Sequence, residues 1–310
     1  MQTATNESLD FVGHAFRTAQ ELFRVPSLAR SALHPLKRLR VRAGCLKGLD
    51  FLWLEITRRC NLRCAHCYAG SRPQLPLIEK MQFADWCRVM EEARSLGCRR
   101  LQFIGGEPTL HPDLGRLLHY AKRVGFRHCE VFTNATLLRD DLVETFKELG
   151  VLVRFSLYSS DPAIHDQITG QAGSFERTVE GIRRLVRRKI RLDASMILMD
   201  QNAAQAKQTK RFLRRLGVTS FGTDRVRGIG RGEQLVNGAR AMGELCGYCW
   251  SGKLCVDASG DAYPCVFSRF VSVGNCLPGG IKDIVKGEKL SAFRREVFLD
   301  KGGQKNVRQV

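Results

Sequence analysis

The sequence lacks any long apolar segment, and this absence excludes several classes of protein. No run of 18 uncharged apolar residues occurs in the 310-residue chain, which excludes a membrane-spanning helix, and we expect no membrane partner. The first residues, MQTATNESLDF, contain no apolar stretch of the kind found in signal peptides. We therefore expect a cytoplasmic protein. Hydrophobic residues make up 44% and charged residues 26%, which excludes a disordered or low-complexity chain.

Acidic residues are scarce relative to basic ones. Fifty Lys and Arg residues against 31 Asp and Glu residues give a formal net charge of +19. Such a charge attracts nucleic acid, anionic membranes or acidic peptides, so a metal-binding nucleic-acid-binding protein is one alternative. Few aromatic residues are interleaved with the basic ones, and a solvated arginine-rich surface explains the charge equally well. Nucleic acid is therefore the less favoured partner.

Short apolar runs alternate with amphipathic stretches from residue 51 onward, which is typical of parallel βαβ units. This alternation predicts an α/β fold, and six units fall short of a closed eight-unit barrel, so we expect a partial (β/α)6 barrel. Residues 1–50 are predicted to form a helical and basic arm, residues 51–230 the core, and residues 231–310 a small cysteine-rich module. The predicted strands are Phe51–Ile56, Leu101–Ile104, Glu130–Thr133, Val151–Tyr158, Arg191–Leu198 and Thr219–Asp224.

Twelve cysteines are too many for an ordinary cytosolic chain of this size, and in a reducing compartment clustered cysteines indicate metal or redox chemistry. Three of them form the segment Cys60-Asn-Leu-Arg-Cys64-Ala-His-Cys67. Three thiolates on one short loop can converge on one metal centre. His66 could complete a tetrahedral zinc site, whereas a [4Fe–4S] cluster held by three cysteines leaves one iron open for a substrate or cofactor.

This segment resembles the CxxxCxxC signature of the radical S-adenosylmethionine (radical SAM) superfamily, with His66 at the position that is usually aromatic. The sequence Gly105-Gly106-Glu107-Pro108 follows the second predicted strand and is similar to the GGEP motif of that family. The resemblance implies that Cys60, Cys64 and Cys67 hold the catalytic cluster and that the GGEP residues bind the methionyl amine of SAM. It also implies that Asn134 lies near the ribose and Ser156 near the SAM carboxylate.

The polar candidates all follow predicted strands, as ligand-binding groups do in parallel α/β barrels. After the sixth strand, Arg225 and Arg227 stand beside glycines in the segment DRVRGIGR. Arginines at this place could bind a carboxylate or phosphate of the substrate. A basic hinge between two domains is the alternative interpretation.

Cysteines gather again near the C-terminus, where the glycine-rich chain has little apolar surface and would need a metal to fold. From the cysteines alone, a zinc ribbon and an iron–sulfur cluster are comparably favoured. The stretch CVDASGDAYPC followed by VGN resembles SPASM or twitch modules, which implies one auxiliary [4Fe–4S] cluster. If Cys255 faces the core, Cys276 is expected to take its place as a cluster ligand. The expected ligands are Cys246, Cys249, Cys255 and Cys265.

Together these features identify the chain as a radical SAM enzyme with a shortened SPASM/twitch extension. The resemblance implies reductive cleavage of SAM to a 5′-deoxyadenosyl radical, which abstracts a hydrogen atom from the substrate. We expect the substrate to be a ribosomally made peptide. The alternative is a small molecule in antibiotic or sugar-nucleoside biosynthesis. The expected electron donor is a protein such as flavodoxin or ferredoxin.

Overall fold

The computed structural model describes residues 48–77, 79–236 and 241–301. The predicted arm, residues 1–50, lies outside these ranges except for its last three residues. A single sheet of nine strands organises the rest, in the order β6-β5-β4-β3-β2-β1-β7-β8-β9. Strands β1 to β7 pair in parallel, and β8 and β9 are antiparallel.

The six predicted strands are all present, within a few residues of their expected ends. They are β1 (Phe51–Glu55), β2 (Arg100–Ile104), β3 (His128–Thr133), β4 (Leu152–Ser156), β5 (Arg191–Leu198) and β6 (Phe221–Arg225). Strands β1 to β4 are built around fully buried apolar side chains because both faces of a parallel sheet are covered. Examples are Leu52, Leu54, Phe103, Val131 and Phe155.

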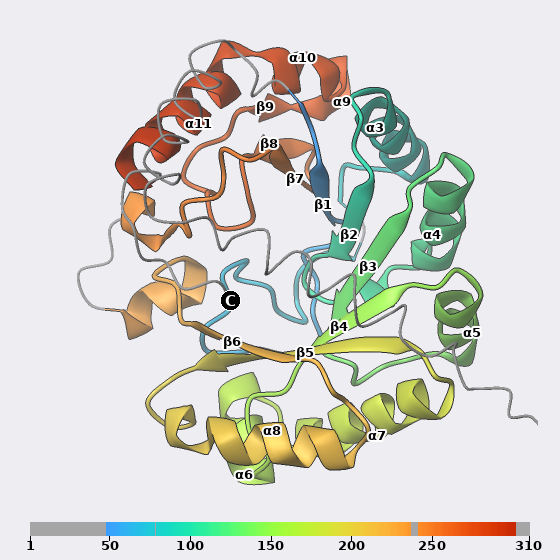
Figure 1. The fold of residues 1–310 in the computed structure, drawn as a ribbon, viewed down its shortest axis with the longest axis vertical. Helices are drawn as coiled ribbons and strands as arrows, with labels where there is room; N and C mark the ends of the chain where they lie inside the picture. The colour runs from blue at the N-terminus through green and yellow to red at the C-terminus, as the bar shows by residue number, and fades with distance from the viewer. Residues whose placement is uncertain (1–47, 78, 237–240, 302–310) are drawn as a thin grey trace, which may run out of the picture. The chain divides into compact units, whose positions relative to one another are not determined.

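Helices follow the strands and cover the convex side of the curved sheet (Figure 1). The helices between β1 and β6 are α3 (Phe83–Ser95), α4 (Leu114–Arg123), α5 (Asp140–Glu148), α6 (Pro162–Thr169), α7 (Ser174–Arg187) and α8 (Ala206–Arg215), with the short 3-10 turns η1 (Pro108–Leu110) and η2 (Ala203–Gln205). This confirms the α/β class and the six-unit parallel core. Helix α6 is an addition to the elements that the sequence predicts. No helix in the described part of the chain is long and apolar enough to cross a bilayer.

The C-terminal segment continues the core sheet instead of forming a sheet of its own. After η3 (Gly230–Leu235) and η4 (Ala241–Glu244), β7 (Lys253–Asp257) pairs with β1, and β8 (Asp261–Tyr263) and β9 (Gly274–Asn275) extend the edge. Leu254, Val256 and Ala262 belong to the same buried cluster as Leu52. The predicted boundary at residue 231 is thus crossed by hydrogen bonds and by the core. Helices α9 (Cys276–Gly279), α10 (Lys282–Lys286) and α11 (Glu288–Lys301) complete this part.

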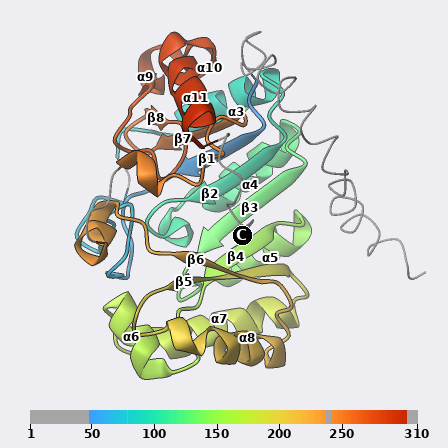
Figure 2. The ribbon, with the colours of Figure 1, turned by 60° about the vertical axis from the view of Figure 1, so that its left-hand side comes forward.

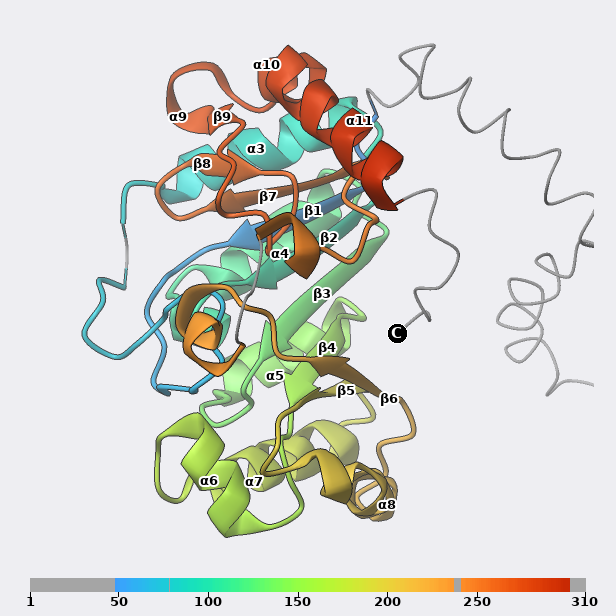
Figure 3. The ribbon, with the colours of Figure 1, turned by 90° about the vertical axis from the view of Figure 1, so that its left-hand side faces the viewer.

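The loops at the carboxyl ends of the parallel strands gather on one side of the molecule. Figures 2 and 3 show the blue loop that follows β1 next to the orange segment that follows β6. A backbone hydrogen bond of 3.0 Å from Arg231 N–H to the Cys67 carbonyl oxygen joins the two segments. Residues from the first and last units of the six-unit core therefore meet at the site described next.

Candidate functional site

The three cysteines of the CxxxCxxC motif lie on the loop after β1. Cys60 is buried, whereas Cys64 and Cys67 are half-buried. Burial raises the pKa of the Cys60 thiol and raises that of Cys64 to about 12. Such thiols stay protonated near neutral pH unless a bound cation displaces the proton, as metal binding does. Within the described residues, no three His, Cys, Asp or Glu side chains already surround a single metal-ion position.

Helix α6 supports one side of this loop. The Arg63 N–H donates to the Thr169 carbonyl oxygen and the Ala65 N–H to that of Ile168, both at 2.9 Å. These carbonyls belong to the last turn of α6, where carbonyl groups lack partners inside the helix. Gly170 ends the helix with a φ of 66°, a left-handed conformation that glycine adopts without strain. The end of α6 thus fixes the loop between Cys60 and Cys67.

The two glycines of the GGEP motif let it lie directly on the base of the cysteine loop. A Cβ atom added to Gly105 would be 2.3 Å from the Thr57 carbonyl oxygen, and one added to Gly106 would be 2.1 Å from that of Arg59. The Gly106 N–H donates to the Thr57 oxygen at 2.7 Å. Any larger residue would separate the two segments. The glycines therefore allow the GGEP turn to approach the backbone of the cysteine loop closely.

Glu107 is 1% exposed and ties the GGEP turn to the end of β3. Its Oε1 accepts hydrogen bonds from the Thr109 N–H, the Thr109 hydroxyl and the Thr133 hydroxyl. Its Oε2 accepts from the Asn134 N–H at 2.7 Å. Burial raises the pKa of Glu107, and the donors oppose this shift. Because Oε2 has only one donor here, it retains capacity for a second, such as an ammonium group. Pro108 begins η1.

Asn134 connects the GGEP turn with the cysteine loop. Its Nδ2 donates to Asn61 Oδ1 at 2.9 Å and lies 3.8 Å from Cys60 Sγ. Asn134, the predicted ribose neighbour, therefore also lies beside Cys60. Ser156 ends β4, where its side chain hydrogen-bonds to the Tyr158 hydroxyl.

His66 lies against Tyr158, with ring centroids 4.8 Å apart in an edge-to-face arrangement. Burial, together with the positive charge of Arg231, lowers the pKa of His66 to about 4. The imidazole is therefore neutral near pH 7. Its Nδ1 is buried and has no hydrogen-bond partner. Tyr158 also packs in one cluster with Cys64, so this tyrosine connects Ser156 with the cysteine loop.

Arg231 and Gly230 close the other side of the loop. Arg231 Nε donates to the Cys64 carbonyl oxygen and Nη2 to the Ser71 carbonyl oxygen, both at 2.9 Å. A Cβ on Gly230 would be 2.4 Å from the Tyr68 carbonyl oxygen. The segment DRVRGIGR was noted in the sequence for its arginines. The sequence pattern could not show that Arg231 of this segment contacts the cysteine loop.

Arg225 and Arg227 make contacts within the protein. Arg225 pairs with Glu244 at 3.0 Å, and Arg227 donates through Nη2 to both Asp224 oxygens and through Nη1 to the Glu244 carbonyl oxygen at 2.7 Å. The Arg227 side chain is 11% exposed. The Gly228 N–H donates to Glu244 Oε2. These contacts are of the kind expected for a basic hinge, because they attach the segment after β6 to Glu244, two residues before Cys246.

Three C-terminal cysteines lie together. Cys249 Sγ is 3.2 Å from Cys265 Sγ, and Cys249 also hydrogen-bonds to Cys246. The Cys249 thiol donates to both neighbours, which lowers the pKa of Cys246 and Cys265 and raises that of Cys249. Cys255 is buried on β7 between Trp53 of β1 and Tyr263 of β8, near enough to Cys265 for their charges to interact. Cys276 lies apart in the main core, 3.8 Å from Met81 Sδ.

A buried polar unit separates the two groups of cysteines. Glu55, 1% exposed at the end of β1, accepts a hydrogen bond of 3.1 Å from the Tyr68 hydroxyl and forms an ion pair with Arg269. Tyr68 follows Cys67, and its ring packs edge-to-face on Phe267 at 5.4 Å. Negative charge on Cys67, Cys255 or Cys265 would raise the pKa of Tyr68. Sequence analysis missed this unit, although a glutamate in the apolar run FLWLEI was a usable signal.

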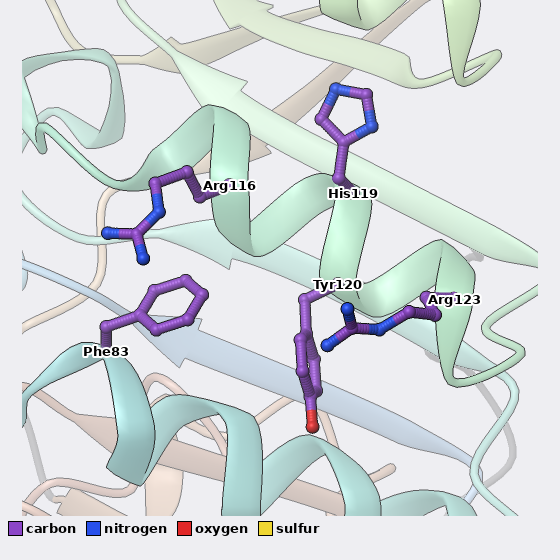
Figure 4. A pocket seen from close by; sticks show the side chains of 5 residues that line it. All are labelled: Phe83, Arg116, His119, Tyr120 and Arg123. Atoms are coloured by element: carbon purple, nitrogen blue, oxygen red, sulfur yellow. The ribbon is translucent and has the colours of Figure 1, made fainter.

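A hollow of about 570 Å³ on the outer helices lies away from the cysteines (Figure 4). Its side chains come from α3 and α4, and two arginines already cover its aromatic faces. The Arg116 guanidinium is 4.0 Å from the centre of the Phe83 ring, and that of Arg123 is 4.4 Å from the centre of the Tyr120 ring. No strand end contributes to it. We therefore place the chemistry at the strand ends and not in this hollow.

Comparison with known families now gives the site its context. Residues 54–213 match the radical SAM superfamily, and residues 246–307 match SPASM, an iron–sulfur cluster-binding domain. The chain belongs to the radical SAM superfamily. It is a radical SAM enzyme, and the cofactors of the family are a [4Fe–4S] cluster and SAM. The thiols of the cysteine loop and the acceptor oxygen of Glu107 fit such groups.

The relatives are named for the synthesis of different products. The chain is 32% identical over 187 residues to the antilisterial bacteriocin subtilosin biosynthesis protein AlbA of Bacillus subtilis, covering 59% of this chain and 41% of AlbA. It is 29% identical over 181 residues to the AdoMet-dependent heme synthase of Methanosarcina barkeri, covering 58% of this chain and 51% of that protein. The chain thus matches about half the length of these relatives.

The fold matches that of Streptococcus suis SuiB bound to its precursor peptide SuiA. The TM-score is 0.68 with 15% identity, over 94% of this chain and 74% of SuiB. The match extends beyond the six-unit core into the C-terminal strands. At this identity the likeness is one of fold.

Proposed function

We propose that this enzyme modifies a ribosomally made peptide. The observation that carries the proposal is the placement of a second group of cysteines, Cys246, Cys249 and Cys265, across Tyr68 from the cysteine loop. Removing one hydrogen atom from a substrate carbon leaves one unpaired electron, and a second redox centre nearby can accept that electron. Oxidative changes to peptides, such as cross-links, need this pair of steps. AlbA, by its name, serves the biosynthesis of a bacteriocin.

In this proposal Cys60, Cys64 and Cys67 hold the catalytic cluster. When bound there, the cluster and SAM supply a 5′-deoxyadenosyl radical that abstracts a hydrogen atom. Glu107 Oε2 and the turn it stabilises bind the methionyl amine, with Asn134 and Ser156 toward the ribose and carboxylate. His66 and Tyr158 form an apolar wall that excludes water from the loop. We further propose one auxiliary cluster, on the three gathered cysteines with Cys255, and ferredoxin or flavodoxin as the electron donor.

The test uses the reconstituted full chain under anaerobic conditions with SAM and dithionite. The probe is the short peptide encoded closest to the gene, synthesised with deuterium at its side-chain and α carbons. We expect transfer of deuterium to 5′-deoxyadenosine and loss of two hydrogen atoms from the peptide. Formation of 5′-deoxyadenosine without either change in the peptide would overturn the peptide assignment.

A small-molecule substrate is the second candidate, favoured by the match to a heme synthase. The same reaction run with cell metabolites in place of the peptide distinguishes the two. Deuterium transfer from a metabolite fraction of a culture grown in deuterated medium, with none from the peptide, would support the small-molecule reading. In either case the residues that hold SAM keep their proposed roles.

A further inference from the structure

Arg231 hydrogen-bonds the segment after β6 to the cysteine loop. The guanidinium of Arg231 binds two carbonyl oxygens, those of Cys64 and Ser71, and its own N–H binds a third, that of Cys67. These acceptors lie on both sides of the last cysteine of the motif. A planar guanidinium holds two acceptors in a fixed relative geometry, which an ammonium group does not. The three bonds therefore restrict the loop from Cys64 to Ser71.

The backbone beside Arg231 is fixed as well. Gly230 has a φ of 61°, and a Cβ there would lie 2.4 Å from the Tyr68 oxygen and 2.6 Å from the Cys67 oxygen. At the other end of the same segment, the Gly228 N–H donates to the buried Glu244 carboxylate at 2.9 Å. Arg231 is consequently presented to the loop from a segment that is itself held at both ends.

Arg231 differs from the neighbouring arginines in its ion pairs. Within the described ranges, no Asp or Glu forms an ion pair with it, whereas its neighbours Arg225 and Arg227 pair with Glu244 and Asp224. In a half-buried place an uncompensated cation acts on neighbouring anions with little screening.

We propose that Arg231 is a positioning residue for the catalytic cysteine loop, and that its charge also favours the reduced form of the cluster proposed there. The guanidinium fixes the carbonyls so that the thiols keep their places. Reduction adds one electron from the external reductant and breaks no bond, so the reduced centre carries one more negative charge. A nearby cation stabilises that form more than the oxidised one. This inference rests on the cluster assignment and is independent of the substrate.

Two substitutions separate geometry from charge. Arg231→Lys keeps the charge but cannot hold two carbonyls in the same plane, and Arg231→Met removes both. Arg94→Met is the matched control, because Arg94 is also half-buried and its guanidinium also donates to two carbonyl oxygens, those of Val124 and Cys98, at the opposite end of the strands.

The first measurement is amide hydrogen exchange in the chain without its cluster. We expect the amides of residues 60–72 to exchange at least tenfold faster in both Arg231 variants and at the wild-type rate in Arg94→Met. Unchanged exchange of these amides in both Arg231 variants would overturn the positioning role. If Arg231→Met does not fold, Arg231→Lys alone decides this point.

The second measurement is the midpoint potential of the reconstituted cluster whose electron paramagnetic resonance signal changes when SAM is added. We expect Arg231→Met to lower it by about 59 mV or more, which corresponds to a tenfold change in the one-electron equilibrium. Arg231→Lys should stay near the wild-type value. Equal potentials in wild type and Arg231→Met would overturn the electrostatic part. Neither measurement uses a peptide, so both results can be interpreted even if the peptide assay of the proposed function fails.

Discussion

Replacement of Glu107 tests whether the GGEP turn is held by this side chain. In Glu107→Ala, the buried N–H groups of Thr109 and Asn134 lose their acceptor, while the two threonine hydroxyls can rotate to other acceptors. A buried donor without a partner costs about 1–3 kcal/mol, so the loss should be about 2–6 kcal/mol in the free energy of unfolding. In Glu107→Gln, the remaining side-chain oxygen can still accept from the three donors of Oε1, but the new NH2 group faces the Asn134 N–H, which loses its acceptor. The free energy of unfolding should therefore fall by only about 1–3 kcal/mol.

Urea denaturation of the chain without its cluster measures these differences. Glu91→Gln is the control, because Glu91 accepts a hydrogen bond from Tyr120 on the exposed surface and should change stability by less than about 0.5 kcal/mol. SAM affinity of the reconstituted enzyme adds an independent readout. Loss of the Oε2 acceptor should weaken binding by about 1.5–3 kcal/mol in Glu107→Gln. A Glu107→Ala protein as stable as wild type would refute the reasoning from the four hydrogen bonds.

Two further predictions concern the iron content and the acid stability of the chain. Replacing all three motif cysteines with Ala should abolish 5′-deoxyadenosine formation with dithionite and reduce the iron content from about eight to about four per chain. If that variant holds one zinc and no iron, the C-terminal cysteines form a structural zinc site. His165 of α6 accepts a hydrogen bond from the Tyr158 N–H, and burial lowers its pKa to about 4, below its unfolded value of about 6.5. The contribution of neutral His165 to the free energy of unfolding is therefore fully present above pH 6.5 and falls by about 3 kcal/mol as the pH drops to 4. In acid titrations followed by circular dichroism, His165→Gln should show a smaller loss of stability over this pH range.

Much of the fold could be predicted because most strands of the six-unit core are marked twice, by an apolar run and by a helix that follows. The run LQFIGGEP identified both β2 and the turn that carries Glu107, because a strand buried on both faces reads as continuously apolar. Helix α6 was not predicted. Its eight residues, Pro162–Thr169, are too few to show helical periodicity, although Asp161 and Pro162 are a typical helix start.

The contacts between distant segments could not be predicted. Arg225, Arg227 and Arg231 look alike in the sequence, and only the fold shows that two of them pair with acids while Arg231 reaches the cysteine loop. Cys255 is a similar case, since alternation along β7 decides which way it faces, and the partner strand of β7 was not apparent from its sequence. That partner is β1, roughly 200 residues earlier in the chain.

The pairing of β7 with β1 explains why the two cysteine groups lie close together. Strand β1 leads directly into the cysteine loop, and β7 carries Cys255, so one ladder of backbone hydrogen bonds sets the distance between the groups. Glu55, the last residue of β1, then binds Tyr68 from the loop and Arg269 from the C-terminal part. Glu244 makes a second connection through Gly228 and Arg225. A substitution at Glu55 or Glu244 should therefore disturb both cysteine groups at once, whereas one at Glu107 should disturb only the first.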